Sequence, residues 1–404
     1  MRVLIADVFE EWGLDELRRT GCEVAYQPKL EGESLRETIA RTRCIVLIVR
    51  GTRVTEAMLD ATDVLSLVVR AGAGFNTIDV AAASRRSILV ANCPGKNAVA
   101  VAELTFALIL ALDRQIADNV ADLRGGIWNK KKYSEARGLK DRTLGIIGLG
   151  QIGQAVAARA LAFEMRVAAW SRSLAQQSAD ALRVEACSTP LEVASRSDIL
   201  TVHLATSPDT KGIINADVLA ALRPGSCVIN TARADVMDYA ALADAVRKKA
   251  IRVGLDVYPD EPTGGEGTFR AAILDAGGIV YGTHHIGAST EQAQEAIARE
   301  TVRIVSEYQQ NGRVENCVNL SARSRGRYVV VIRHRNRPGV LAHTLNEISL
   351  AGVNVEEMEN VICEGGDSAC ARIKLAGPLH NDVLERIQRG HEHVLGVALS
   401  PVRV

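Results

Sequence analysis

The segment Thr143–Gly153 reads TLGIIGLGQIG and decides the fold of the middle of this chain. An apolar run typical of a buried strand leads into three glycines spaced G-x-G-x-x-G, and an alanine-rich segment typical of a helix follows. In this pattern the first glycine permits a tight turn, the second lets backbone approach a pyrophosphate, and the third lets the helix pack closely on the sheet. The helix N-terminus then offers N–H groups and a positive dipole end to phosphate. The segment therefore predicts a dinucleotide-binding unit.

Composition excludes several classes of protein. The 404 residues suggest two or three domains, and 48 basic residues balance 48 acidic ones, so neither nucleic acid nor an anionic membrane is an expected partner. Eight scattered cysteines lack zinc-site spacing, so we expect reduced thiols and no metal site. The N-terminus lacks the long apolar core of a signal peptide, and the apolar segment 98–112 is too short to span a membrane. We expect a cytoplasmic protein.

Short apolar runs alternate with amphipathic segments through the first 290 residues or so. This βαβ rhythm predicts an α/β fold with two doubly wound parallel sheets and a ligand cleft between them. The strands expected before the glycines are 3–6, 22–26, 44–49, 65–69 and 88–91, and those expected after them are 166–169, 199–203, 226–230, 252–256 and 278–282.

The last part of the chain changes character. After the polar stretch 321–326, strand and helix patterns follow in the order βαββαβ, which describes a ferredoxin-like domain. We expect a substrate-binding domain at 1–95 completed by 288–320, a Rossmann nucleotide-binding domain at 96–287, a linker at 321–326 and a small domain at 327–404.

Three strand ends after the glycines carry reactive side chains. Arg233 follows one expected strand, Glu261 follows the next, and His284 and His285 follow the last. Ligands of open α/β sheets bind at the carboxyl ends of the strands, so topology brings these groups to the cofactor side. Oxidation of a 2-hydroxy acid beside a nicotinamide needs a planar cation for the carboxylate and a base for the hydroxyl proton. A carboxylate behind a histidine base orients it and stabilises its charged form.

The same residues carry a family resemblance. The glycine loop, the Asn230–Arg233 segment, the run Asp256–Pro262 and His285–Thr290 together resemble the D-isomer-specific 2-hydroxyacid dehydrogenases. Upstream, Arg70–Gly74 and the segment 92–97 resemble the substrate loop and interdomain crossing of that family.

The resemblance implies a role for each matching residue. Arg233 would bind the substrate carboxylate, His285 would be the acid/base, and Glu261 would be its partner. The substrate would also be approached by Ala71, Gly72, Ala73, Gly74 and Asn97. His284 leaves an ambiguity, because neighbouring side chains in extended backbone point in opposite directions and only one histidine should face the cleft. The residues that follow favour His285.

The C-terminal domain suggests which hydroxy acid is used. Its segments around 334–341 and 352–354 resemble an ACT domain of the kind found in D-3-phosphoglycerate dehydrogenases. That resemblance implies that His334, Asn336 and Asn354 bind an L-serine effector across a subunit interface. The alternative is a domain that only dimerises, with these polar residues capping a turn.

A phosphorylated substrate also needs cations away from its carboxylate. Arg50, Arg53 and Lys130 resemble positions near the substrate phosphate in those enzymes, although a lysine within the run Lys130–Lys132 could equally be solvated. The resemblance further implies a homodimer or homotetramer.

The expected cofactor is NAD or NADP. About twenty residues past the glycines, NAD-preferring folds place an acidic residue on the adenosine ribose, but here Ser171 occupies that place and Arg172 follows. No carboxylate at Ser171 repels a 2′-phosphate, and Arg172 could bind one. The predicted cofactor-binding residues are Gly148, Gly150, Gln151, Ile152, Gly153, Ser171, Arg172, Thr231 and Asp256.

Together these patterns predict an NAD(P)-dependent dehydrogenase whose small-molecule substrate is 3-phosphoglycerate, at the entry to serine synthesis. One alternative is an NADPH-dependent glyoxylate or hydroxypyruvate reductase, which the Ser171–Arg172 pair would suit and the C-terminal domain would not. The other is a non-catalytic cofactor-sensing regulator, against which the intact Arg233, Glu261 and His285 argue.

Overall fold

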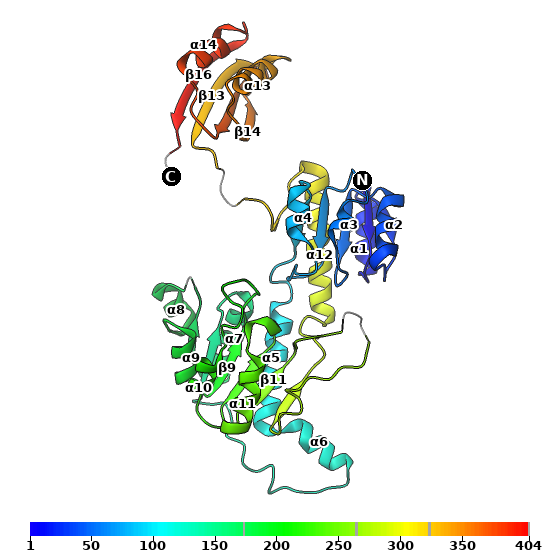
Figure 1. Ribbon diagram of the computed structural model, residues 1–404, viewed down its shortest axis with the longest axis vertical. Helices are drawn as coiled ribbons and strands as arrows, with labels where there is room; N and C mark the ends of the chain where they lie inside the picture. The colour runs from blue at the N-terminus through cyan, green and yellow to red at the C-terminus, as the bar shows by residue number, and fades with distance from the viewer. Residues whose placement is uncertain (173, 263–265, 322–324, 403–404) are drawn as a thin grey trace. The chain divides into compact units, whose positions relative to one another are not determined.

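A computed structural model describes residues 1–172, 174–262, 266–321 and 325–402. Its contacts divide the chain into two units, Met1–Asn319 and Leu320–Val404 (Figure 1). Residues 322–324 of the expected linker lie outside the described residues. The finer expected boundaries, at 95/96 and 287/288, stay predictions.

The first unit begins with a five-stranded sheet in the order β2-β1-β3-β4-β5, in which every pair of neighbours is parallel. Helices α1 and α12 cover one face of the sheet through an apolar cluster that includes Leu17 and Ile304. Helices α2, α3 and α4 cover the other face through a second cluster that includes Leu35 and Met58. The elements are β1 (Arg2–Ile5), α1 (Glu11–Arg19), β2 (Glu23–Tyr26), α2 (Gly32–Thr42), β3 (Val46–Val49), α3 (Glu56–Leu59), β4 (Leu67–Arg70), α4 (Val80–Arg85), β5 (Leu89–Asn92) and α12 (Glu291–Asn311).

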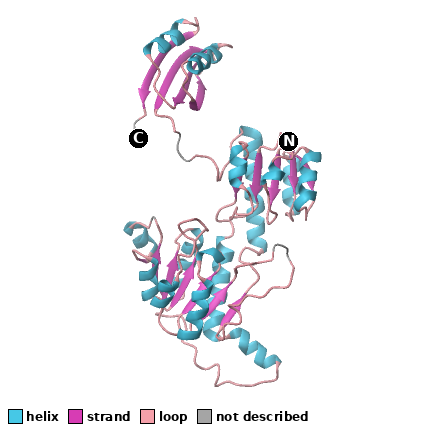
Figure 2. Ribbon diagram, in the orientation of Figure 1, coloured by secondary structure: helices cyan, strands magenta, loops and turns pink. Residues whose placement is uncertain are grey.

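The second sheet of this unit has seven parallel strands in the order β12-β11-β10-β9-β6-β7-β8 (Figure 2). The strand order reverses between β6 and β9, which makes this the switch point where ligands of doubly wound sheets bind. The strands are β6 (Thr143–Ile147), β7 (Arg166–Trp170), β8 (Glu185–Ala186), β9 (Ile199–Val202), β10 (Cys227–Asn230), β11 (Arg252–Leu255) and β12 (Val280–Gly282).

Helices cover both faces of the seven-stranded sheet. Helices α5, α7 and α8 pack on one face, where Ile109 and Val156 are fully buried. Helices α9, α10 and α11 pack on the other, where Val193 and Leu242 are fully buried. These helices and their neighbours are α5 (Ala98–Arg114), α6 (Ile116–Arg124), α7 (Gln151–Ala162), α8 (Gln176–Leu182), α9 (Pro190–Arg196), α10 (Ala216–Ala221), the 3-10 turn η1 (Ala234–Val236) and α11 (Tyr239–Lys249).

The chain returns to the five-stranded sheet after completing the seven-stranded one. Helix α12 packs against α1, and the segment that follows it runs antiparallel to β5. The backbone N–H of Val318 donates to the carbonyl of Val90 at 2.8 Å, and that of Val90 donates to the side chain of Asn319 at 2.8 Å.

The second unit has the expected βαββαβ order. Its four strands pair antiparallel in the order β14-β15-β13-β16, which is the ferredoxin-like arrangement. Both helices contribute to one apolar core, in which Ile332, Ile348 and Ile387 are buried. The elements are β13 (Tyr328–Arg335), α13 (Val340–Leu350), β14 (Val355–Ile362), β15 (Ser368–Leu375), α14 (Asn381–Arg389) and β16 (Val394–Pro401).

The predicted fold class is therefore confirmed, with parallel α/β sheets followed by an antiparallel C-terminal domain. The two-residue strand β8 was not expected, because Glu185–Ala186 lacks an apolar run. Within the described part of the chain, no helix combines the length and hydropathy needed to cross a membrane.

Candidate active site

The glycine loop connects β6 to α7, and the structure shows a separate reason for two of its three glycines. Gly148 has φ +99°, and a Cβ there would lie 2.4 Å from the carbonyl oxygen of His203. A Cβ on Gly153 would lie 2.1 Å from the carbonyl oxygen of Gly148, so only glycine lets α7 start this close to the strand. Gly150 precedes α7 and has open space where its side chain would be. An open backbone cradle at a helix N-terminus fits a dinucleotide pyrophosphate.

The remaining predicted cofactor residues divide into two groups. Gln151 and Ile152 form the first turn of α7, and Ser171 and Arg172 directly follow β7, so these four lie at the carboxyl edge of the sheet. Thr231 directly follows β10 at the same edge, but it is buried and its hydroxyl lies 3.0 Å from that of Thr105.

Asp256, another predicted cofactor residue, has hydrogen-bond partners within the chain. Its carboxylate is buried and accepts hydrogen bonds from the hydroxyl of Thr283 and from the backbone N–H groups of Ile286 and Gly287, at 2.6–2.8 Å. Asp256 therefore fixes the loop that carries His285, and its contact with the cofactor stays a prediction.

The predicted acid/base pair is assembled. Nδ1 of His285 lies 2.7 Å from Oε2 of Glu261, while Oε1 of Glu261 accepts the backbone N–H of Tyr258 at 2.8 Å. An ionised carboxylate can only accept, so Nδ1 of His285 carries the proton and its Nε2 is left with a lone pair. His285 has φ +54°, a left-handed conformation set by the turn that Asp256 holds.

Several neighbours act on the pKa of the Glu261 carboxyl. Burial acts to raise it, but hydrogen bonds from His285 and from the backbone of Tyr258, together with the charge of Arg233, outweigh burial and lower the pKa. Glu261 is therefore held ionised, as a partner for a histidine base must be.

Arg233 is positioned by the strand end that precedes it. The Asn230 side chain accepts the N–H of Ala232 and donates to the carbonyl of Arg233, each at 3.0 Å, which locks the loop after β10. Burial lowers the pKa of Arg233 while the charge of Glu261 opposes this. Nη2 of Arg233 lies only 2.2 Å from where a Cβ on Gly74 would be, so the guanidinium fills the space that this glycine leaves.

The loop Ala71–Gly74 has a second guanidinium beside it. Nη1 of Arg70 lies 1.6 Å from where a Cβ on Gly72 would be, and Gly72 has φ +150°. Nε of Arg70 is buried without a hydrogen-bond partner among the described residues. Burial, together with the charges of Arg233 and Arg50, lowers the pKa of Arg70 to about 10. Arg70 was not predicted as a site residue.

The guanidinium groups of Arg50, Arg70 and Arg233 therefore lie near the loop Ala71–Gly74. In the described structure, none of the three is ion-paired with a carboxylate. The loop itself is fixed from β5, because the side chain of Asn92 donates to the carbonyl of Ala73 at 2.6 Å and Cys93 N–H donates to that of Gly72 at 2.9 Å. Mutual repulsion of this kind is relieved by an anionic ligand.

A cavity of about 840 Å³ joins these groups. Glu261 and His285 line it, and Arg233 lies against the loop Ala71–Gly74 that forms part of its wall. The lining includes the predicted Arg50, Ala71, Gly72, Ala73 and Asn97, and also Arg70, Tyr258, Glu266, Phe269 and His284. Oδ1 of Asn97 is buried and has no partner in the described structure, so it is available to a ligand.

The lining of this cavity bears on two predictions, one about His284 and one about Arg53. His284 and His285 both line it, because the left-handed turn at His285 breaks the extended alternation on which the choice between them rested. Arg53 is exposed and is not among the residues that line the cavity.

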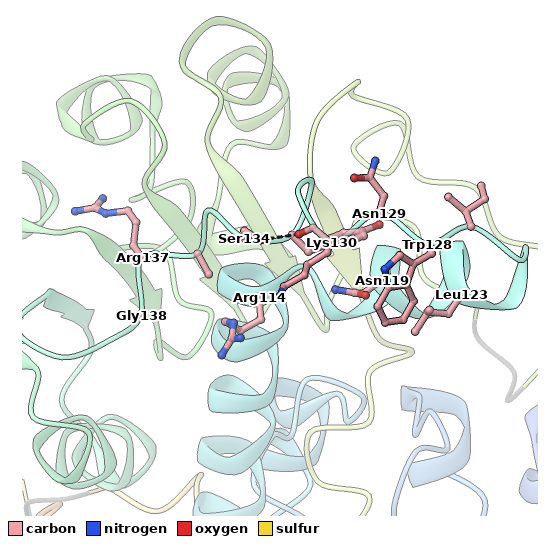
Figure 3. A pocket seen from close by; sticks show the side chains of 12 residues that line it. Arg114, Asn119, Leu123, Trp128, Asn129, Lys130, Ser134, Arg137 and Gly138 are labelled. Carbon is pink, nitrogen blue, oxygen red and sulfur yellow. Dashed lines mark hydrogen bonds between the residues drawn. The ribbon is translucent and has the colours of Figure 1, made fainter.

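Lys130 lies elsewhere. It lines a separate cavity of about 730 Å³ beside α6, together with Arg114, Trp128 and Arg137 (Figure 3). The resemblance to a phosphate-binding position implied that Lys130 lies near the substrate. Within one chain, however, Lys130 lines a different cavity from the arginines near the loop Ala71–Gly74.

The predicted effector residues of the second unit are not equivalent. His334 is buried, and its ring nitrogens lie 2.8 Å from the carbonyl of Arg335 and 3.0 Å from Oδ1 of Asn360, so neither is free for a ligand. Within one chain the ring of His334 therefore has a structural role, and its contact with serine stays a prediction. Asn336 is half-buried and its side chain donates to the carbonyl of Gly366, whereas Asn354 is exposed and its side chain donates to the carboxylate of Glu356.

The residues that the structure describes hold no cluster able to bind a metal ion. The acid/base pair, the converging guanidinium groups and the open glycine loop can together grip an anionic hydroxy acid, accept its hydroxyl proton and hold a dinucleotide.

Comparison with known proteins identifies relatives of this arrangement. Residues 106–287 match the family model described as the D-isomer specific 2-hydroxyacid dehydrogenase, NAD binding domain. The chain is similar to D-3-phosphoglycerate dehydrogenase of Methanocaldococcus jannaschii, with 31% identity over 406 residues that cover 100% of this chain and 72% of the relative. It is 38% identical to the Mycobacterium leprae protein of the same name, over 64% of this chain and 48% of that one.

Solved structures agree with these relatives. Over 79% of this chain and 99% of the other, the fold is similar to the NAD+-bound 3-phosphoglycerate dehydrogenase of Entamoeba histolytica, with a TM-score of 0.66 and 26% identity. The chain thus spans about half to three quarters of the length of these two sequence relatives and nearly all of the solved structure.

Proposed function

Since the chain belongs to the family of D-isomer-specific 2-hydroxyacid dehydrogenases, we propose that it oxidises 3-phosphoglycerate to 3-phosphohydroxypyruvate, at the entry to serine synthesis. The observation that carries this proposal is the convergence of Arg50, Arg70 and Arg233, with Nε of Arg70 buried and unpaired in the described structure. Relatives named D-3-phosphoglycerate dehydrogenase support the same substrate.

The number of cations favours a substrate with two anionic groups. One guanidinium is enough for a two-point grip on a carboxylate, and Arg233 beside Gly74 takes that role. Arg70 and Arg50, which line the cavity, are then left to bind a second anion. A phosphate satisfies both guanidinium groups, whereas glyoxylate carries one carboxylate and leaves Arg70 buried and unpaired.

The proton is moved by His285. Its Nε2 accepts the hydroxyl proton of the substrate, and the ionised carboxylate of Glu261 stabilises the imidazolium that forms. A nicotinamide dinucleotide held at the glycine loop through its pyrophosphate would supply the hydride acceptor for the carbon that carries this hydroxyl. Arg233 holds the carboxylate so that the hydroxyl lies within reach of Nε2.

The matched NAD-binding domain makes a nicotinamide dinucleotide the cofactor, as NAD or NADP. The residues that would hold it are Gly148, Gly150, Gln151, Ile152, Gly153, Ser171 and Arg172. The eight cysteines are all free, which supports a cytoplasmic setting in which thiols stay reduced.

We also propose a homo-oligomer that uses the arm formed by α6 and the loop after it. Helix α6 buries none of its residues, and Leu123, Ile127 and Trp128 are exposed by half or more. Leu123 and Trp128 both line the cavity of Figure 3. A second copy that covers this apolar arm would account for it. Size-exclusion chromatography with light scattering tests this, and a Trp128→Asp variant should shift the mass towards that of the monomer.

An L-serine effector remains a proposal for the second unit. It now rests on Asn336 and Asn354 alone, since His334 is engaged within the sheet. Isothermal titration of the full chain with L-serine tests it, and a chain that binds no serine at millimolar concentration contradicts it.

The substrate proposal is tested by an activity screen of 2-hydroxy and 2-keto acids with each nicotinamide cofactor. We expect the highest kcat/KM with 3-phosphoglycerate and phosphohydroxypyruvate, and an Arg70→Ala variant should lose that advantage while keeping its activity towards glyoxylate. Equal efficiency with glyoxylate in the unaltered chain would favour the reductase alternative. No turnover with any acid, while the cofactor binds, would favour a regulator.

A further inference from the structure

The end of β7 carries an ion pair that bears on cofactor choice. Ser171 occupies the position where an acidic side chain would receive the adenosine ribose, and the next residue, Arg172, is exposed. Nη1 of Arg172 lies 3.1 Å from Oδ2 of Asp209, which lies 37 residues later in the chain. Position 171 thus lacks an acidic side chain, but the carboxylate of Asp209 lies nearby on another loop.

Asp209 is held in place by the loop that follows β9. Thr210, the next residue, is buried, and its hydroxyl donates to the carbonyl of Ala205 at 2.6 Å. The same hydroxyl accepts the backbone N–H of Ser207 at 2.8 Å. Two side-chain hydrogen bonds therefore fix the backbone turn that carries Asp209, from which its exposed carboxylate reaches Arg172.

Both partners of the pair flank the glycine loop. The N–H of Gly148 donates to the carbonyl of Trp170, directly before Ser171, at 2.8 Å. On its other side, Gly148 packs against the carbonyl of His203, at the start of the loop that carries Asp209. The strands β7 and β9 therefore end on either side of the loop expected to hold the pyrophosphate, and the adenosine ribose lies at this edge in such folds.

We propose that Asp209 selects NAD over NADP. Its carboxylate neutralises Arg172, the cation that a 2′-phosphate would otherwise use, and it adds a negative charge beside the position that this phosphate would occupy. The ribose hydroxyls of NAD carry no charge and are not repelled. The proposal rests on the proposed function only in requiring that the glycine loop binds a nicotinamide dinucleotide.

Equilibrium binding of NADH and NADPH to the purified chain tests the proposal, with quenching of protein fluorescence as the readout. We expect NADH to bind at least tenfold more tightly than NADPH. The Asp209→Asn variant should bind NADPH five- to twentyfold more tightly, with its affinity for NADH changed less than twofold. Adding Arg172→Ala to this variant should remove the gain, because the freed guanidinium is what receives the phosphate.

The matched control is Asp217→Asn, which removes the same charge from an exposed position in the first turn of α10. It should leave the ratio of the two affinities unchanged. The proposal is overturned if the unaltered chain binds NADPH as tightly as NADH, if Asp209→Asn leaves the ratio within twofold, or if Asp217→Asn shifts it equally. Oxidation of 3-phosphoglycerate by the unaltered chain is measured separately, so loss of one proposal leaves the other standing.

Discussion

Replacing Glu261 with glutamine removes one charge from the acid/base pair and leaves its shape intact. Oε1 of Glu261 accepts the backbone N–H of Tyr258, so the carbonyl oxygen of the glutamine is expected to keep that place. The amide NH₂ group then faces Nδ1 of His285, where an ionised oxygen had been 2.7 Å away. An amide NH₂ can only donate, so Nδ1 must become the acceptor and Nε2 must carry the proton.

Two losses follow, and their sizes can be estimated. A hydrogen bond to a charged group contributes about 1.5–3 kcal/mol, so its loss from the imidazolium lowers the rate about 10- to 150-fold. The wrong tautomer also removes the lone pair of Nε2 that accepts the substrate hydroxyl proton, and this effect in a comparable histidine–carboxylate pair reaches about 10⁴-fold. We expect kcat/KM to fall about 10²- to 10⁴-fold in both reaction directions at neutral pH.

Steady-state kinetics with 3-phosphoglycerate, together with the Kd of the dinucleotide and the melting temperature, measure the effect. The matched control is Glu266→Gln, which removes a carboxylate from the same cavity. It should keep kcat/KM within about threefold, because Glu266 has no hydrogen bond to His285 in the described structure. If Glu261→Gln also stays within threefold of the unaltered chain, the assigned role of the pair is wrong.

Three further substitutions test the loop, the buried charges and the core. Gly74→Ala places a methyl group 2.2 Å from Nη2 of Arg233. The KM for the hydroxy acid should therefore rise about tenfold with kcat little changed. An unaltered KM would contradict the role of Arg233 in binding the substrate carboxylate. Glu300→Gln removes a buried carboxylate whose pKa hydrogen bonds from Arg303 hold low. Urea unfolding should show about 2 kcal/mol lost at pH 7. Because the folded-state pKa is depressed, this difference is full above the unfolded pKa of about 4.3 and should vanish as pH falls through the folded value. Leu47→Ala, in fully buried β3, should cost about 3 kcal/mol while the dinucleotide Kd stays unchanged.

Local patterns in the sequence were sufficient for most of the fold. A parallel strand buried on both faces is a short apolar run, so β6 was predicted at its observed bounds and the other strands of both parallel sheets within about two residues, except β8. The carboxyl ends of those strands meet at one edge, which is why Glu261 and His285 could be brought together by topology alone.

The misplaced residues depend on contacts that no local pattern contains. In the sequence, Arg70 looks like the last residue of an apolar strand. Its proximity to Arg233, roughly 160 residues later in the chain, is created only by the tertiary fold. The signal available was a third strand-end arginine near the same loop. The hydrogen bonds of Asp256 and His334 within the chain were not predicted, because a motif position does not reveal whether a carboxylate or imidazole is already engaged by nearby backbone.

The return of the chain to β5 has a consequence for how the molecule assembles. Val90 pairs with Asn319, which lies 229 residues later, and Cys22 contacts Gln309 across 287 residues, whereas the seven-stranded sheet is complete by Gly282. During synthesis at about 5–20 residues per second, the N-terminal sheet therefore waits tens of seconds for α12 and its last pairing segment. The seven-stranded sheet should therefore fold on the ribosome before the five-stranded sheet is complete. Until the segment after α12 pairs with β5, the edge of β5 is exposed, so chaperones should matter most in that interval.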